Sequence, residues 1–200
     1  MLTGDSLQTK TYRRCSSRAK KAMQSQMAEF LSALHAFPLA IAKRHRVPSM
    51  HPRKVFAQRM GTYRKNLLKT LTAKELKSVL TFLDESKSHV DDAYTPCFIH
   101  CDLYVDHIFT DNRHSKITGI IDFGDRAIFD PAIDFSGLWD YGREFVRNVY
   151  AQYTGPKDQT FLKRSWLRYK HGALGWLCAA RQGKIENGKE AYEHFKKYFH

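Results

Sequence analysis

Two apolar runs near the middle of the chain, each carrying an aspartate, constrain the fold more than any other feature of the sequence. The first run, 98–109, encloses Asp102, and the second, 117–121, is followed directly by Asp122. The polar residues 111–115 lie between the runs and are typical of a turn. A hairpin of this kind brings Asp102 and Asp122 to the same end of a small sheet. Two carboxylates held there can bind a divalent cation and accept a proton from a hydroxyl.

Length and composition favour one globular domain. The chain has 200 residues, of which 42% are hydrophobic and 13% aromatic, and these values argue against intrinsic disorder. No apolar run reaches the roughly 20 residues needed to cross a bilayer, and the first residues lack the pattern of a signal peptide. We therefore expect a cytoplasmic protein with no membrane partner.

The charge is distributed unevenly along the chain. The net charge of +13 raises nucleic acid as a partner. Residues 91–140, however, contain ten acidic and three basic residues, so an acidic centre lies within a basic remainder. Asp140 and the following acid Glu144 could attract a cationic substrate. Because the acids cluster where the apolar runs lie, a nucleic-acid-binding protein is the less favoured alternative.

The rest of the chain is predicted to be mainly helical. Apolar residues spaced by three and four predict helices over 17–36 and from about 159 to a terminator at Gly183, and a last helix over 191–199. Thr72 and Glu75 have the spacing of a capping box, and Asp130-Pro131 predicts another helix start. These patterns predict an α+β, mainly helical single domain over 1–200, with helical parts at 1–95 and 130–200 and a catalytic hairpin at 96–129.

Cys97, His100 and Cys101 lie close enough in sequence to suggest a metal site. On a strand, however, the two cysteines share a face while His100 points to the opposite one. The sequence also offers no evident fourth ligand, so we do not expect a structural metal there.

The order of the central residues resembles a known family. His100-x-Asp102, then His107, then Ile121-Asp122-Phe123-Gly124, is similar to the pattern of the aminoglycoside and macrolide phosphotransferases, the antibiotic kinases. Residues 30–38 and 130–135 resemble two further motifs of that family, in the same order. The resemblance implies the large C-terminal lobe of a protein-kinase-like fold. It also implies an enzyme that uses Mg²⁺ and ATP or GTP to phosphorylate a hydroxyl of an aminoglycoside, a macrolide or a sugar-like small molecule.

The same resemblance assigns roles to individual residues. Asp102 would be the catalytic base, and His107 and Asp122 would hold the metal. His100 and Asp134 would brace the loop around Asp102. His107 is a departure, because most members of the family have Asn at this position, and imidazole is a less usual ligand for Mg²⁺ than an oxygen.

A second departure concerns nucleotide binding. The eleven glycines are scattered singly and form no glycine-rich loop over phosphates. Residues 1–7 instead resemble the end of the hinge between the two lobes of the family. We therefore expect the N-terminal nucleotide lobe to be absent. The chain would then be either a fragment of a longer kinase or a product read from an internal methionine. We also expect little activity from the chain alone. The alternative is a catalytically inactive, pseudokinase-like interaction module.

Overall fold

The computed structural model describes residues 4–200, which divide into two compact units. Unit 1 comprises the chain up to Ser49 together with Tyr94–Ser165, and unit 2 comprises Met50–Ala93 together with Trp166–His200. The hinge-like segment 1–7 falls partly outside the described residues, but Asp5–Ser6 forms strand β1. The single-domain boundaries predicted from the sequence stay a prediction.

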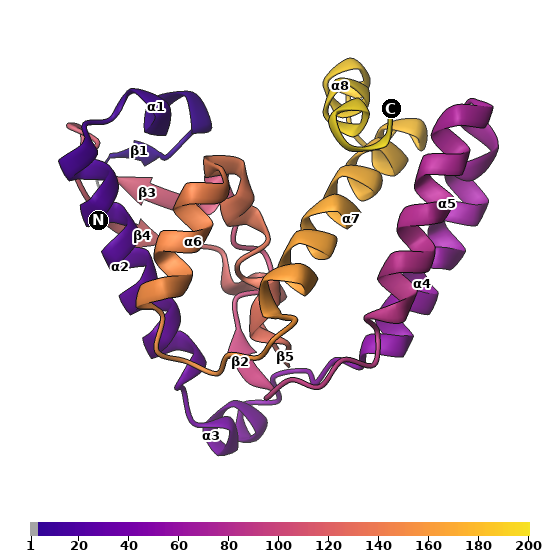
Figure 1. Cartoon of the computed structure of the whole chain (residues 1–200). Helices are drawn as coiled ribbons and strands as arrows, with labels where there is room; N and C mark the ends of the chain where they lie inside the picture. Colours follow the sequence, from indigo (N-terminus) through magenta and orange to yellow (C-terminus); the bar gives the residue numbers. More distant parts are fainter. Residues whose placement is uncertain (1–3) are drawn as a thin grey trace. The chain divides into compact units, whose positions relative to one another are not determined.

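Unit 1 combines helices with two small antiparallel sheets (Figure 1). The first sheet has the strand order β1-β3-β4, and the second pairs β2 with β5. Its α-helices are α1 (Thr9–Arg14), α2 (Ser17–His35), α3 (Leu39–Arg44), α6 (Arg143–Gln152) and the start of α7 (Phe161–Arg181). Its strands are β1 (Asp5–Ser6), β2 (Cys97–Ile99), β3 (Ile108–Thr110), β4 (Ile117–Ile120) and β5 (Ala127–Phe129). Its 3-10 helices are η2 (Val105–His107), η3 (Phe123–Asp125), η4 (Pro131–Ile133) and η5 (Gly137–Tyr141).

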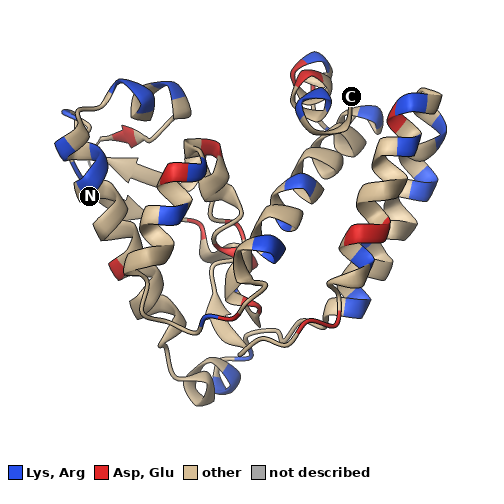
Figure 2. Ribbon diagram, viewed as in Figure 1, with Lys and Arg blue, Asp and Glu red and all other residues tan. Residues whose placement is uncertain are grey.

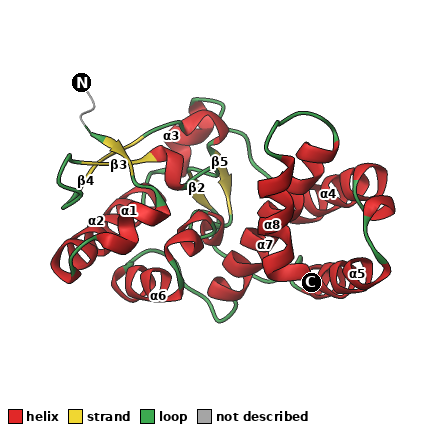
Figure 3. Cartoon of the chain, turned by 90° about the horizontal axis from the view of Figure 1, so that it is seen from above, coloured by secondary structure: helices red, strands yellow, loops and turns green. Residues whose placement is uncertain are grey.

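Helices α2 and α6 lie side by side over the core of unit 1 (Figures 1 and 3). On α2 the buried apolar side chains recur every four residues, at Met23, Met27 and Leu31, which places them on one face. They pack in one cluster with the buried face of α6, including Phe145 and Val149. The sequence prediction of this helix is confirmed, including its end before proline.

The first apolar run is not one strand, which corrects the sequence prediction. The run is interrupted at residues 100–107, so β2 and β3 belong to different sheets. The hairpin joins β3 to β4, with Ile108 opposite Ile120. Its turn is fastened by Asp111, whose Oδ1 accepts the backbone N–H of Ser115 at 2.6 Å. Asp102 therefore lies in a loop before the hairpin rather than on one of its strands.

The helix predicted from Asp130 is also only partly correct. Asp130 does act as an N-cap, because its Oδ1 accepts the backbone N–H of Ala132 at 3.0 Å. The structure that follows, however, consists of the two short 3-10 helices η4 and η5 rather than one α-helix.

Within the described residues, the secondary-structure elements of unit 2 are all helices. It contains α4 (Pro52–Asn66), η1 (Leu68–Thr70), α5 (Ala73–Ser88), the remainder of α7 and α8 (Gly188–Phe199). The predicted capping box is confirmed at α5, where Glu75 Oε2 accepts the backbone N–H of Thr72 at 2.8 Å and Thr72 Oγ1 accepts that of Glu75 at 3.3 Å. The core includes Tyr63, Leu67, Val79, Phe82, Leu83, Leu174, Leu177, Phe195 and Phe199.

The helices carry most of the basic charge. Helices α1, α4 and α7 contain Lys and Arg but no Asp or Glu (Figure 2). Among residues 4–200, no helix combines the length and the apolar character that crossing a membrane would require.

Candidate functional site

Residues 100–107, the Asp102 loop, connect β2 to β3, and the buried carboxylate of Asp134 holds the start of this loop. Asp134 is 1% exposed. Its Oδ2 accepts the backbone N–H of His100, and its Oδ1 accepts that of Cys101, both at 2.8 Å. Cys101 has φ +72°, a left-handed conformation that costs a non-glycine residue about 1 kcal/mol or more. The two charge-assisted hydrogen bonds offset this cost and fix where the loop turns.

His100 connects the Asp102 loop to the segment that carries Asp122. The ring is fully buried. Its Nδ1 accepts the backbone N–H of Asp102 at 3.3 Å, so the ring proton is on Nε2, which donates to the carbonyl of Ile121 at 2.8 Å. The ring also lies 4.5 Å from that of Phe123, measured between centroids. One imidazole therefore ties together the backbones on both sides of the site.

His107 lies between the two candidate carboxylates. Its Nδ1 is 2.6 Å from the backbone carbonyl of Asp102, and because a carbonyl can only accept, this nitrogen carries the proton. The neutral ring then has its lone pair on Nε2, which lies 3.6 Å from Oδ2 of Asp122. The structure thus brings together Asp102, His107 and Asp122, as the sequence predicted, although through the loop rather than through paired strands.

Both aspartates present their carboxylates to solvent. The side chain of Asp102 is 39% exposed, and its Oδ2 lies 3.6 Å from Nδ1 of His107, beyond hydrogen-bond distance. The side chain of Asp122 is 59% exposed. Asp122 has φ +63° and ψ +64°, and its Oδ1 accepts the backbone N–H of Gly124 at 3.3 Å. The backbone at both positions is held while the charged oxygens remain accessible.

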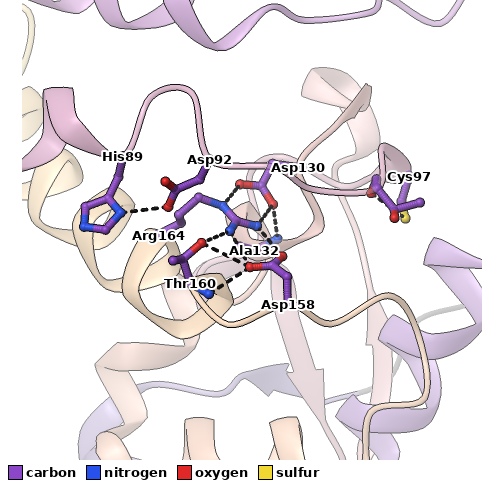
Figure 4. Close-up of polar contacts among 9 residues, drawn as sticks. His89, Asp92, Cys97, Asp130, Ala132, Asp158, Thr160 and Arg164 are labelled. Carbon is purple, nitrogen blue, oxygen red and sulfur yellow. Dashed lines mark hydrogen bonds and ion pairs between the residues drawn. The ribbon is translucent and has the colours of Figure 1, made fainter.

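A buried ion cluster supports the segment that leads to Asp134 (Figure 4). Arg164 donates from Nε and Nη2 to the two oxygens of Asp130, at 2.7 and 3.0 Å, and from Nη1 and Nη2 to those of Asp158, at 2.7 and 2.9 Å. The hydrogen bonds from Arg164 lower the pKa of the Asp158 carboxyl. Since Asp130 also caps η4, the cluster fixes the start of the short helix that Asp134 directly follows.

The two acids suggested for substrate binding lie on neighbouring elements. Asp140 is half-buried on η5, which packs against η2 of the Asp102 loop. Glu144 is exposed in the first turn of α6. Burial, together with the charges of Asp140 and Asp106, raises the pKa of the Tyr141 hydroxyl. Tyr141 and Phe145 are buried in the core of unit 1.

The candidate metal ligands suit a cation that takes most of its ligands from substrate and water. Within residues 4–200, no group of three or more His, Cys, Asp or Glu side chains is arranged to hold a metal, and this includes the cysteine-rich segment around His100. His107 Nε2 and Asp122 Oδ2 offer two donors. Mg²⁺ is commonly held by one or two protein ligands and completed by phosphate oxygens and water, so the residues present fit that ion.

Sequence reasoning missed two residues that contact this network. His35 lies with Nε2 3.0 Å from Oδ2 of Asp134 and Nδ1 2.7 Å from the hydroxyl of Tyr153. His35 falls within one of the family-like motifs, which could have signalled a role. Tyr153 follows the apolar spacing of α6 and gave no signal.

The fold and site define the class of protein. The fold is α+β and mainly helical, and the Asp102 loop presents Asp102 beside Asp122, which follows a hairpin. This arrangement is that of the large lobe of a protein-kinase-like fold. A family model described as the phosphotransferase enzyme family (APH) matches residues 5–165. The chain therefore belongs to this phosphotransferase family, as its resemblance to the antibiotic kinases indicated.

Solved structures agree with this assignment. A GDP complex of a point mutant of aminoglycoside 2'-phosphotransferase-IIIa has 27% identity and a TM-score of 0.87, over 98% of this chain and 67% of that chain. The GDP and kanamycin complex of APH(2")-IIIa has 26% identity and a TM-score of 0.87, over 98% and 68%. Macrolide 2'-phosphotransferase type I, at 21% identity and a TM-score of 0.73 over 100% and 67%, shares the fold. A comparison with curated protein sequences gives no significant match.

Proposed function

We propose that this chain supplies the base and the cation ligands of a small-molecule kinase, which transfers the γ-phosphate of ATP or GTP to a hydroxyl. The observation that carries the proposal is the position of His107, which contacts the Asp102 backbone through one nitrogen and faces Asp122 with the other. The ring therefore links Asp102, where a hydroxyl would lose its proton, to Asp122, where a cation would hold the phosphates. Phosphoryl transfer depends mainly on this kind of positioning.

Asp102 is the proposed base. Its carboxylate is accessible, while its backbone N–H and C=O are both engaged, by His100 and by His107. An acceptor hydroxyl can therefore approach a carboxylate whose position is already fixed, and can pass its proton to it as the oxygen attacks phosphorus.

His107 and Asp122 are the proposed ligands of Mg²⁺. The ion, when bound, would neutralise charge on the nucleotide phosphates. His107 can offer the Nε2 lone pair only because its Nδ1–H is committed to the Asp102 carbonyl. His100 and Asp134 are positioning residues, because each contacts the backbone of the Asp102 loop rather than its solvent side.

The proposed substrate class is an aminoglycoside, with a macrolide or sugar-like hydroxyl compound as the second candidate. Kanamycin occurs in the complex of one relative, and a cationic sugar suits the acidic centre that includes Asp140 and Glu144. The nucleotide would be contacted in part by residues corresponding to the third of those relatives that this chain does not span.

The experiment joins residues 5–200 to the part of APH(2")-IIIa that this chain does not cover. Transfer from ATP and from GTP is then measured with kanamycin and with a macrolide as acceptors. We expect Asp102→Asn to lower the transfer rate about 100-fold or more. Asp125→Asn is the matched control, because Asp125 is an exposed acid three residues after Asp122, and it should leave the rate unchanged. Equal rates for wild type and Asp102→Asn would contradict the proposed role of Asp102.

A catalytically inactive interaction module remains the second candidate. It is favoured by the absence of a glycine-rich phosphate loop among the 200 residues. A chimera that binds nucleotide but transfers no phosphate to either acceptor would support this alternative.

A further inference from the structure

A line of buried hydrogen bonds enters the Asp102 loop from the interior of unit 1. The hydroxyl of Tyr153 lies 2.7 Å from Nδ1 of His35, and Nε2 of His35 lies 3.0 Å from Oδ2 of Asp134. The same carboxylate accepts the backbone N–H groups of His100 and Cys101. Tyr153 and Asp134 are each 1% exposed and His35 is 5% exposed, so water does not substitute for these contacts.

The partners fix the direction of each hydrogen bond. Both oxygens of Asp134 serve as acceptors of amide N–H groups, so Nε2 of His35 donates to Oδ2. In this neutral tautomer Nδ1 carries only a lone pair, and it must accept from the Tyr153 hydroxyl. Burial raises the pKa of that hydroxyl, which therefore keeps the proton that it donates. The Tyr153 hydroxyl thus provides the hydrogen bond that Nδ1 needs in the tautomer in which His35 donates to Asp134.

Packing holds the Tyr153 hydroxyl at His35. The phenol ring lies 5.3 Å from the ring of Phe135 and 5.9 Å from that of Phe161, between centroids. Gly155 leaves the space that the phenol occupies, because a Cβ at this position would overlap the Tyr153 oxygen and ring carbons next to it. These ring contacts would serve a phenylalanine equally well, so replacing Tyr153 by phenylalanine removes the hydroxyl and keeps the packing.

We propose that Tyr153 is a remote positioning residue for the Asp102 loop, acting through His35 and Asp134. The inference rests on the proposed role of Asp102 as the base. Loss of the hydroxyl leaves Nδ1 of the buried His35 ring without the hydrogen bond that it accepts from Tyr153. The ring is then held by its contact with Asp134 alone, and it can shift away from the carboxylate. The carboxylate gains freedom to turn, and the loop amides that set the position of Asp102 lose their fixed partner.

The test compares two tyrosine-to-phenylalanine variants of the 200-residue chain. Tyr153→Phe removes the proposed donor. Tyr141→Phe is the matched control, because the Tyr141 hydroxyl is also buried in the same core and donates one hydrogen bond, to the carbonyl of Leu7 at 2.7 Å. Amide hydrogen exchange at His100 and Cys101, and the imidazole nitrogen chemical shifts of His35, are measured by NMR without nucleotide or acceptor. Because these measurements require no phosphate transfer, their outcome does not depend on whether the proposed kinase activity is found.

The expected result is selective. In Tyr153→Phe the two loop amides should exchange about fivefold faster or more, a factor that corresponds to the loss of one net hydrogen bond, and the His35 shifts should change. In Tyr141→Phe any acceleration should be shared by the protected amides of unit 1, and the His35 shifts should stay at their wild-type values. A second variant, Gly155→Ala, keeps the phenol but displaces it, and should reproduce the changes seen in Tyr153→Phe. Wild-type exchange at both loop amides in Tyr153→Phe and Gly155→Ala would overturn the proposal.

Discussion

His107 donates from Nδ1 to the backbone carbonyl of Asp102 at 2.6 Å, and Nε2 of the same ring lies 3.6 Å from the carboxylate of Asp122. This single side chain relates the loop before the hairpin to the segment after it. The carbonyl requires a proton on Nδ1, and the neutral ring then has its lone pair on the Nε2 that faces Asp122. The position of the Asp102 loop and the availability of a cation ligand are therefore coupled.

We predict that His107→Ala weakens cation binding about 10- to 100-fold, because both a ligand and the contact that orients Asp102 are lost. The measurement is the Kd for Mn²⁺, which prefers oxygen ligands much as Mg²⁺ does, from the broadening of amide signals near Asp122. His107→Asn should retain more affinity than His107→Ala, because an amide oxygen can take the place of the imidazole nitrogen.

The control for this prediction is His45→Ala, because His45 is exposed in unit 1 and ends α3. An unchanged Mn²⁺ affinity in His107→Ala would remove His107 from the cation site.

We predict that Asp134→Ala lowers the free energy of unfolding of unit 1 by about 3 kcal/mol or more. The change leaves the buried amide of His100, the half-buried amide of Cys101 and the His35 ring without an acceptor, and each unsatisfied buried group costs roughly 1–3 kcal/mol. Urea unfolding is followed through NMR signals of unit 1 residues, and the exposed Asp125→Ala should change the free energy by no more than about 0.5 kcal/mol. A loss in Asp134→Ala no larger than in that control would show that the carboxylate does not hold the loop.

Local sequence patterns correctly predicted those elements that are stabilised by contacts between residues close together in the sequence. The spacing of Met23, Met27 and Leu31 predicted α2, and the pair Thr72 and Glu75 predicted the start of α5. Each of these signals involves residues within one or two helical turns. The turn at Asp111 was predicted for the same reason, because its contacts reach only to Ser115 and Lys116.

The interruption of the first apolar run could not be predicted from local patterns. Residues 98–109 have strand-forming side chains, and no glycine or proline marks a break. The break depends on Cys101 in a left-handed conformation, which is stabilised by Asp134, 33 residues further along the chain. The contact of Tyr153 with His35 spans 118 residues. The strand pattern predicted that Asp102 and Asp122 lie close together, but it placed Asp102 in the hairpin rather than in the loop before it.

We predict that Gly137→Ala destabilises unit 1 by about 1–3 kcal/mol, the usual cost of overpacking. A Cβ at Gly137 would overlap the backbone carbonyl of Leu103, which is part of the Asp102 loop. The measurement is again urea unfolding read in unit 1, together with the amide chemical shifts of Leu103 and Tyr104. Gly61→Ala is the control, since a Cβ there meets nothing within 4 Å in α4, and alanine should stabilise that helix by about 0.5–1 kcal/mol. Unchanged loop shifts in Gly137→Ala would show that the loop does not depend on this close approach.

We predict that acid destabilises unit 1 in part through Asp158. The hydrogen bonds from Arg164 lower the pKa of the Asp158 carboxyl in the folded chain, whereas the unfolded carboxyl has its ordinary value of about 3.9. The unfolded state therefore binds more protons between these two values, so the contribution of Asp158 is fully present above about pH 4 and is lost as the pH falls through the lowered folded pKa. Free energies of unfolding measured by urea at a series of pH values from 7 to below 4 should fall more steeply for wild type than for Asp158→Asn. Parallel curves for the two proteins would show that the ion pair with Arg164 does not contribute to the acid sensitivity of unit 1.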